Sequence, residues 1–160
     1  LSKKQTFKLQ LISIDGYSYT KNGFKKMEIK SLEKIEILNN SSNGQGGFKI
    51  LLENLKMTIS EGIWSANEPQ YVQTKSINKA TLNKIIETLN HGDILNWKET
   101  YNGGCIGDRN LTITIIYNRK HVKKINGIFG GCPDNFKELL LPFNKIIPGK
   151  LNTFNTMVLD

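Results

Sequence analysis

The spacing of apolar residues constrains the fold of this chain most strongly, because its period changes along the sequence. In "FKILLENLKMTISEG" (48–62) apolar and polar residues alternate around Glu53-Asn54, which predicts a β-hairpin with its turn at those two residues. In "SINKATLNKIIETLNHGD" (76–93) the apolar residues instead recur every three or four positions, which predicts an amphipathic helix. A chain that carries both periods in separate blocks is expected to fold into an α+β domain.

Capping residues mark the ends of this predicted helix. Ser76 or Asn78 can cap its first turn, and Gly92 suits the left-handed position that ends many helices. A second helix is predicted to begin at Pro133, and Pro142 is expected to end or kink it. Its buried stripe is expected to consist of Phe136, Leu139 and Leu140.

The N-terminal third predicts strands. Residues 6–15 alternate with one change of phase, and residues 16–30 form a turn and a second strand, with Asn22-Gly23 as a favourable hairpin turn. "SLEKIEILNN" (31–40) fits either a helix or a strand. We choose the strand, because the Asn- and Gly-rich stretch that follows it would break a helix. Together with the hairpin at 48–62, these strands are expected to form an antiparallel meander.

The segments around the helices complete the expected architecture. "WSANEPQYVQTK" (64–75) predicts a loop and a short strand, residues 94–104 an irregular segment, and "LTITIIYNRKHVKKING" (111–127) a second hairpin. We therefore expect one α+β domain over residues 1–150, an antiparallel sheet with two main helices on one face. A duplicated ββα unit is one interpretation of this order. Residues 151–160 are expected to be a tail or a last strand.

The only two cysteines, Cys105 and Cys132, each follow two glycines and flank the second hairpin. If residues 118–119 form a two-residue turn, paired residue numbers sum to 237, as the two cysteine numbers do. That register predicts a disulfide across the open end of the hairpin, with the glycines allowing close approach. It also places Ile113 opposite Lys124, so we expect a bulge or a three-residue turn to shift the pairing. The alternative is two small, buried free cysteines.

A disulfide would carry consequences for stability and location. It would stabilise the fold by about 3 kcal/mol in the chain-entropy model and indicate an oxidising compartment. We therefore expect an extracytoplasmic protein of the periplasm, the cell surface or the secreted fraction. The start, "LSKKQTF", has no methionine and no apolar signal core, so we also expect a processed chain that a lipid anchor could have preceded. No stretch is long and apolar enough to predict a transmembrane segment.

The chain is basic, with a net charge of +8 from 22 basic and 14 acidic residues. Only two of the basic residues are arginines, and the lysines are scattered singly or in pairs without a tract or an aromatic-interleaved strand. This distribution favours a solvated basic surface over a nucleic-acid site. The 18 asparagines, together with many lysines and isoleucines, are typical of an AT-rich genome.

No known catalytic motif is present, and we expect no cofactor and no metal site, since neither cysteine has another Cys or His at zinc-ligand spacing. Aromatic residues beside the first helix can anchor a partner or line the rim of the core. Asp108 and Arg109 can form a recognition patch, and Asp108 can instead stabilise its own turn. The candidate binding residues are Trp64, Tyr71, Trp97, Tyr101, Asp108 and Arg109.

Residues 48–147 resemble a family of short uncharacterised domains in bacterial lipoproteins and secreted proteins. The matching pieces are "MTISEG", "KSINKATLNKIIETL", "WKETYNGGCIGDRNLTITIIYNRKHVKKI" and "CPDNFKELLLPFNKII". The chain lacks the Cys-x-x-x-Cys-Pro-like segment that the family often carries upstream. The resemblance implies a location in the cell envelope and no established activity, so it assigns no functional residue.

These observations leave three functional hypotheses. The first is a non-enzymatic extracytoplasmic binding module that presents its sheet face or loops to a protein or another envelope macromolecule. The second is a hydrolase-like enzyme with an unrecognised site around Asp108, His121 and Arg109. The third is an inhibitor or immunity protein for a secreted toxin, for which the charge of +8 predicts an acidic partner.

Overall fold

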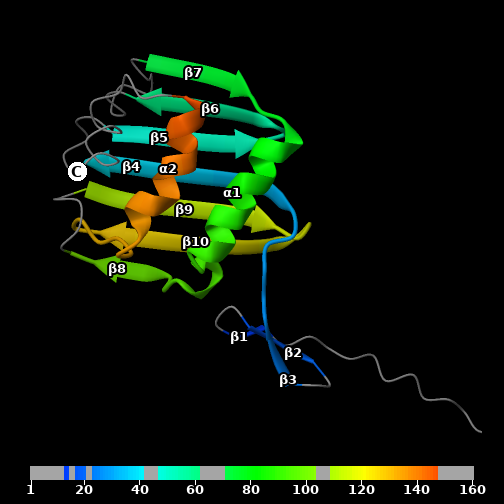
Figure 1. Cartoon of the computed structure of the whole chain (residues 1–160). Coiled ribbons are helices and arrows are strands. Elements are labelled where there is room, and N and C mark those ends of the chain that lie inside the picture. The colour runs from blue at the N-terminus through cyan, green and yellow to red at the C-terminus, as the bar shows by residue number, and fades with distance from the viewer. Residues whose placement is uncertain are drawn as a thin grey trace, which may run out of the picture.

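The structure, a computed structural model, describes residues 13–14, 17–20, 23–41, 47–61, 71–103 and 109–147. Its main body is a seven-stranded sheet with two helices on one face, which confirms the predicted α+β class (Figure 1). The strands are β4 (Leu32–Ser41), β5 (Gly47–Glu53), β6 (Lys56–Glu61), β7 (Tyr71–Ser76), β8 (Thr100–Asn102), β9 (Arg109–Tyr117) and β10 (His121–Ile128). The helices are α1 (Lys79–His91), the short 3-10 helix η2 (Ile94–Asn96) and α2 (Phe136–Ile146).

The strand order in this sheet is β7-β6-β5-β4-β9-β10-β8. Every neighbouring pair is antiparallel except β8 and β10, which run parallel. The structure does not confirm a duplicated ββα unit. A third strand, β7, separates α1 from the β5–β6 hairpin, whereas α2 follows β9 and β10 with no strand between.

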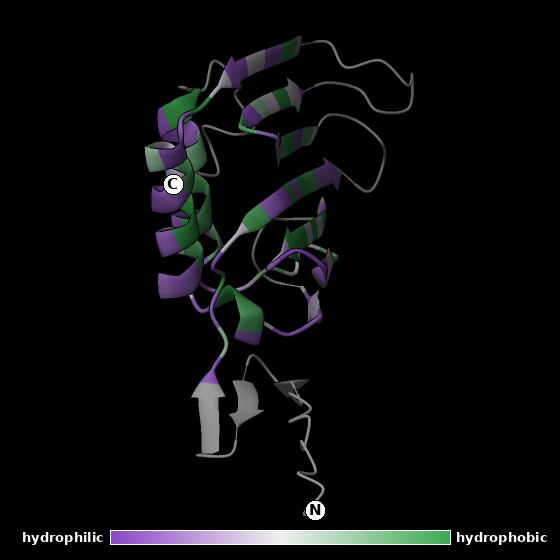
Figure 2. Cartoon of the chain, turned by 90° about the vertical axis from the view of Figure 1, so that its right-hand side faces the viewer, coloured by the Kyte–Doolittle hydropathy of each residue, from purple (hydrophilic) through white to green (hydrophobic). Residues whose placement is uncertain are grey.

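Five isoleucines form one row across the middle of the sheet, on the face that the helices cover. The backbone register pairs them in the order Ile59, Ile50, Ile37, Ile113 and Ile125, and none exposes any surface. Figure 2 shows the hydrophobic sides of the helices turned toward this row and hydrophilic residues on the outer side. Alternation along each strand thus places the core between sheet and helices.

The opposite face of the sheet, called here the open face, is polar. One row across it consists of Thr58, Leu51, Glu36, Thr114 and Lys124, all at least partly exposed. Its exposed apolar side chains are far apart, with Val72 on the edge strand β7 and Val122 and Ile128 at the two ends of β10. A face of this composition is stable in water without a covering layer.

The first three strands do not join the main sheet, so the predicted antiparallel meander is confirmed only from β4 through β7. Strands β1 (Ser13–Ile14), β2 (Tyr17–Thr20) and β3 (Gly23–Lys26) form a separate antiparallel sheet below the main body (Figure 1). The segment after β3 turns away from β2 before β4 begins, because side chains of the main body bind its backbone.

Two asparagines hold that connecting segment. The amide of Asn90 pairs with the backbone of Ile29 in both directions, at 2.9 Å for each hydrogen bond. The Oδ1 of Asn118 accepts hydrogen bonds from the backbone N–H groups of Lys30 at 2.8 Å and Ser31 at 3.2 Å, and its Nδ2 donates to the Glu28 carbonyl at 2.9 Å. The small sheet is therefore tied to the body through backbone groups.

An ion pair adds to this attachment. The Nζ of Lys26 lies 2.9 Å from Oδ1 of Asp93, and Asn96 donates a hydrogen bond to the other carboxylate oxygen. Partial burial raises the pKa of Asp93, but the hydrogen bonds from Lys26 and Asn96 and the Lys26 charge outweigh it and lower the pKa overall. Both side chains are more than a third exposed, so the pair contributes little to stability.

We expect Asn118→Ala to destabilise the protein by about 2 kcal/mol, because three side-chain hydrogen bonds to backbone groups are lost. Asn118 also has a φ of +48°, which alanine tolerates poorly. Asn118→Gly removes the same hydrogen bonds without that strain, so it should cost less. Urea unfolding of both variants measures the difference. An alanine variant within about 0.5 kcal/mol of wild type would contradict this role.

Several local predictions are confirmed. Residues 32–40 lie in β4, the hairpins predicted in residues 48–62 and 111–127 form, and Asn78 caps α1, accepting a hydrogen bond from the Thr81 N–H at 2.8 Å. The predicted buried stripe of α2 is also correct: Phe136, Leu139 and Leu140 are all buried.

Other local predictions are wrong by small steps. The turn between β5 and β6 is at Asn54-Leu55 and not at Glu53-Asn54. Asn54 and Leu55 both have positive φ, and Glu53 is the last residue of β5. The backbone of Gly92 is in the right-handed helical conformation, and the left-handed conformation is adopted by the next residue, Asp93. Residues 100–102, expected to be irregular, form β8.

The second helix also differs from its prediction. It begins at Phe136 and not at Pro133, because a turn comes first in which the Phe136 N–H donates to the Pro133 carbonyl. It then continues through Pro142 to Ile146, so this proline does not end it. Burial of Phe143 and Ile146 against the body holds the last turns in place.

The register of the β9–β10 hairpin is one residue from that of a two-residue turn, and the three-residue turn expected as one alternative is confirmed. Tyr117 pairs with His121, so paired numbers sum to 238 and three residues form the turn. This places Ile113 opposite Ile125 and keeps both in the core. After β10 the chain turns back at Phe129-Gly130, both with positive φ, so Cys132 does not continue the ladder. Cys132 is buried, and Cys105 lies outside the described residues.

Candidate functional site

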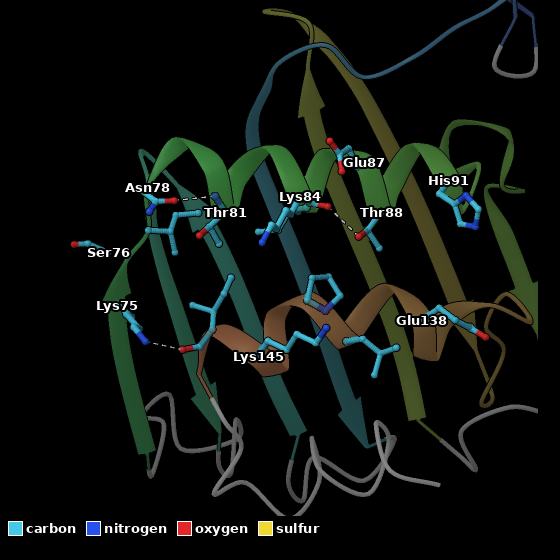
Figure 3. A pocket seen from close by; sticks show the side chains of 15 residues that line it. Lys75, Ser76, Asn78, Thr81, Lys84, Glu87, Thr88, His91, Glu138 and Lys145 are labelled. Carbon is cyan, nitrogen blue, oxygen red and sulfur yellow. Dashed lines mark hydrogen bonds between the residues drawn. The ribbon is translucent and has the colours of Figure 1, made fainter.

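The main concavity of the part of the chain that the structure describes lies between α1 and α2 (Figure 3). It has a volume of about 1120 Å³ and is open to solvent along its length. A smaller hollow of about 280 Å³ continues it past the last turn of α1 and shares Thr88, His91 and Glu138 with it. We call the two together the α1–α2 groove.

The floor of the groove is apolar. Ile85 and Ile146 are buried at its base, and Ile77 and Pro142 lie beside them. Leu141 also lines the groove and is 43% exposed, which is unusual for a large apolar side chain inside a concavity. Exposed apolar surface in a recess is a typical feature of binding sites.

The rim is polar and comes from regular spacing on both helices. On α1, Thr81, Lys84, Thr88 and His91 follow at intervals of three or four residues, so they share one side of the helix. On α2, Glu138 and Lys145 are two turns apart on the same side. The groove is thus an apolar channel between two polar helix stripes.

Hydrogen bonds tie the helices to their surroundings at both ends of the groove. At one end the Nζ of Lys75 donates to the Ile146 carbonyl of α2 at 3.1 Å. At the other end the Gly92 carbonyl after α1 accepts from Trp97 Nε1 at 2.9 Å and from Asn135 Nδ2 at 3.0 Å. These acceptors are carbonyls at helix C-termini, which have no partner within the helix. The groove is therefore held open between two fixed ends.

The charges around the groove are unevenly distributed. Lys75 and Lys145 lie at the end near Ile146, and Lys84 borders the same half (Figure 3). Glu138 and His91 lie at the other end, at the beginning of α2 and the end of α1, and Glu87 lies on α1 between Lys84 and His91. One half is thus basic, and the acidic side chains lie in the other half.

Pro142 removes one backbone hydrogen bond from α2 beside the groove. A proline has no N–H, so Pro142 cannot donate the usual helical hydrogen bond to the carbonyl of Glu138 four residues earlier. Both residues line the groove. The pyrrolidine ring takes the place of that donor, so the group that Glu138 offers to a bound molecule is its carboxylate.

The predicted aromatic binding residues do not form one surface. Trp97 is 8% exposed and donates its indole N–H to Gly92, so it packs in the core, with one edge on the smaller hollow. Tyr101 is half-buried and accepts a hydrogen bond from the Lys98 N–H. Tyr71 is on β7 and Tyr101 on β8, which are the opposite edges of the sheet. Trp64 lies outside the described residues.

The charged residues considered for an enzyme site are not gathered either. Arg109 begins β9, and His121 pairs with Tyr117 at the other end of that strand. Eight residues of strand separate the two ends by about 26 Å. The His121 ring instead stacks on Tyr117, with centroids 5.4 Å apart. Asp108 lies outside the described residues.

Within the described ranges, no group of three or more His, Cys, Asp or Glu side chains is arranged to hold a metal ion. None of the helices in that part of the chain is long and apolar enough to cross a membrane. In comparisons with known proteins, no protein-family model and no curated protein matches this chain. The resemblance to envelope domains therefore stays a prediction from the sequence.

Sequence reasoning missed the α1–α2 groove. A signal was present in the polar stripe that recurs at three- and four-residue intervals through α1, and in Leu141-Pro142 on the outer side of the second helix. A stripe of this kind ordinarily marks a solvated helix face. Only the position of α2 beside it makes the stripe one wall of a groove.

Proposed function

We propose that this chain is a non-enzymatic binding module of the cell envelope that takes a segment of a partner protein into the α1–α2 groove. The observation that carries the proposal is the exposed apolar floor around Leu141 in a recess of about 1120 Å³. A groove with apolar anchors and polar edges suits an amphipathic segment. The sequence left the sheet face or loops as binding surfaces, and in the described residues the open face of the sheet is mainly polar.

An enzyme is the weaker alternative. The Thr88 hydroxyl, beside His91 in the groove, donates its hydrogen bond to the Lys84 carbonyl at 2.9 Å and is not aligned with a base. Arg109 is the first residue of β9, and His121 on β10 pairs with Tyr117 at the far end of β9. A binding role requires none of these groups to act together, so the groove supports it better.

Photo-crosslinking tests the proposal. Benzoylphenylalanine at position 141 in the cells that produce the protein should crosslink to one protein, at one contiguous segment of it. The control is the same probe in place of Val122, a comparably exposed residue on the open face. Equal or stronger capture of the same protein from position 122 would contradict the groove as binding site.

The envelope location rests on the proposed disulfide between Cys105 and Cys132. Cys132 is not a free cysteine within the described part of the chain, and the reversal at Phe129-Gly130 directs the following residues back over β8. A structural disulfide is typical of extracytoplasmic proteins. The resemblance to domains of lipoproteins and secreted proteins supports the same location.

Intact-mass measurement after alkylation checks the disulfide. We expect protein from its native source to gain no alkyl group in denaturant without reductant and two after reduction. The bond would then contribute about 3 kcal/mol to stability. Two alkyl groups without reductant would mean free thiols, and the proposed location would lose its main support.

A further inference from the structure

We infer that the occupant of the α1–α2 groove is an amphipathic helix of a partner protein, acidic in its first turn and basic in its last, that runs parallel to α1. This inference rests on the proposed function and adds the conformation, charge pattern and direction of the bound segment. Each of these follows from a separate property of the groove walls.

The conformation follows from the hydrogen bonding of the walls. Both walls are helices, whose backbone groups are mostly bonded internally, so they offer no row of free N–H and C=O groups to an extended strand. A helix satisfies its own backbone and needs only side-chain contacts. The groove follows α1, whose 13 residues span about 20 Å. That length accommodates about three to four turns of a bound helix.

The anchoring side chains follow from the floor. Leu141, which is exposed, and the partly exposed Ile77 and Pro142 provide apolar surface above the buried Ile85 and Ile146. A bound helix reaches such a floor with apolar residues at intervals of three and four, which form one stripe. Its remaining faces contact the polar stripes of α1 and α2 or solvent.

The direction follows from the charges. Lys75, Lys84 and Lys145 border the half next to the beginning of α1 and the end of α2, and Glu138 lies at the other end (Figure 3). Helices favour acidic residues in the first turn and basic residues in the last turn. A helix that meets both its own preference and the groove charges begins at the lysines and ends at Glu138. It is therefore parallel to α1 and antiparallel to α2.

The Glu138 end is built for a hydrogen-bond donor. Its carboxylate lines the groove and attracts a cation. A lysine or arginine in the last turn of the bound helix can donate to both carboxylate oxygens. Charge-assisted hydrogen bonds of this type are stronger than neutral ones.

A displayed peptide library tests the inference. The probe is a set of 15-residue peptides with leucines fixed at positions 4, 7, 8 and 11, and with Glu, Lys or Gln randomised at the first three and last three positions. Peptides selected on the wild-type protein are counter-selected on Leu141→Glu, which places a charge on the floor. Leu141 is partly exposed, so the Leu141→Glu variant should fold. Thr81→Glu, which places a charge on the rim, is the second variant for counter-selection.

We expect groove-dependent peptides with Glu at the start and Lys at the end, binding at least tenfold more tightly than peptides with the order reversed. The double variant Lys84→Glu/Lys145→Glu should abolish or invert the preference at the first three positions. Lys124→Glu, on the open face, should leave it unchanged. Groove-dependent peptides without this charge order would overturn the inference and leave the proposed function standing. If no selected peptide depends on Leu141 or Thr81, both fail.

Discussion

Gly131→Ala is expected to destabilise the protein by at least about 3 kcal/mol, because a Cβ at this position has nowhere to go. It would overlap the backbone carbonyl of Tyr101 in β8 and lie 2.6 Å from the backbone N of Asn102. Backbone atoms of a paired strand cannot move aside as a flexible side chain can. Urea unfolding measures the loss, and hydrogen exchange of the Asn126 N–H, bonded to the Glu99 carbonyl, reports whether the β8 edge opens.

Gly103→Ala is the matched control. Gly103 also lies next to β8, but a Cβ there would meet nothing closer than 4.0 Å. Its φ of +71° means that alanine brings only backbone strain, of about 1 kcal/mol. Equal losses for the two variants would show that close approach is not the reason for glycine at position 131.

Phe143→Ala should destabilise the protein by about 3–5 kcal/mol, since it removes a large, fully buried side chain and leaves a cavity. Phe143 lies on the inner side of α2, directly after Pro142, where the helix lacks one backbone hydrogen bond. Its burial compensates for that loss and holds the last turn against the sheet. The free energy of unfolding from urea titration gives the value.

Leu141→Ala on the same helix provides the comparison. Leu141 faces the groove and is partly exposed, so we expect a loss below about 1 kcal/mol. If Leu141→Ala cost as much as Phe143→Ala, the side chain at 141 would belong to the core. The apolar floor of the groove would then not be available to a partner.

The strands and helices of the main body were predictable because their signals are local. Period-two alternation in "FKILLENLKMTIS" and helical spacing in residues 80–89 each arise from contact with one core face. The side chain of Asn78 caps α1 by a bond within one turn, so it was also predictable. The burial of one isoleucine row across five strands then follows from the alternation of apolar and polar residues along each strand.

The errors in the predicted structure occur where contacts with residues distant in sequence determine the local conformation. Strand β8 has three residues and pairs with β10 in parallel, so its own sequence carries no alternation to detect. The hairpin register shifts by one because a three-residue turn keeps Ile113 opposite Ile125 in the core. Asn118 within that turn is also held by the backbone of the distant segment 28–31. A turn rule based on two residues cannot include that contact.

The candidate site was not predictable from the chain for a related reason. Trp97 resembles a surface anchor in a loop, but its partner, the Gly92 carbonyl, becomes available only because α1 ends there. The two walls of the groove come from helices separated by more than 40 residues. Pro142 was expected to end or kink the helix, and its position in the middle of α2 contributes to the groove.

Chemical-shift mapping of isotope-labelled protein tests the central claim most directly, with the segment identified by crosslinking as the titrant. We predict that the backbone amides of Thr81, Thr88 and Lys145, all on the groove, shift on binding. The amides of Thr58 and Thr114, on the open face, should remain in place. Shifts confined to the open face, with none in α1 or α2, would contradict the assignment of the α1–α2 groove as the binding site.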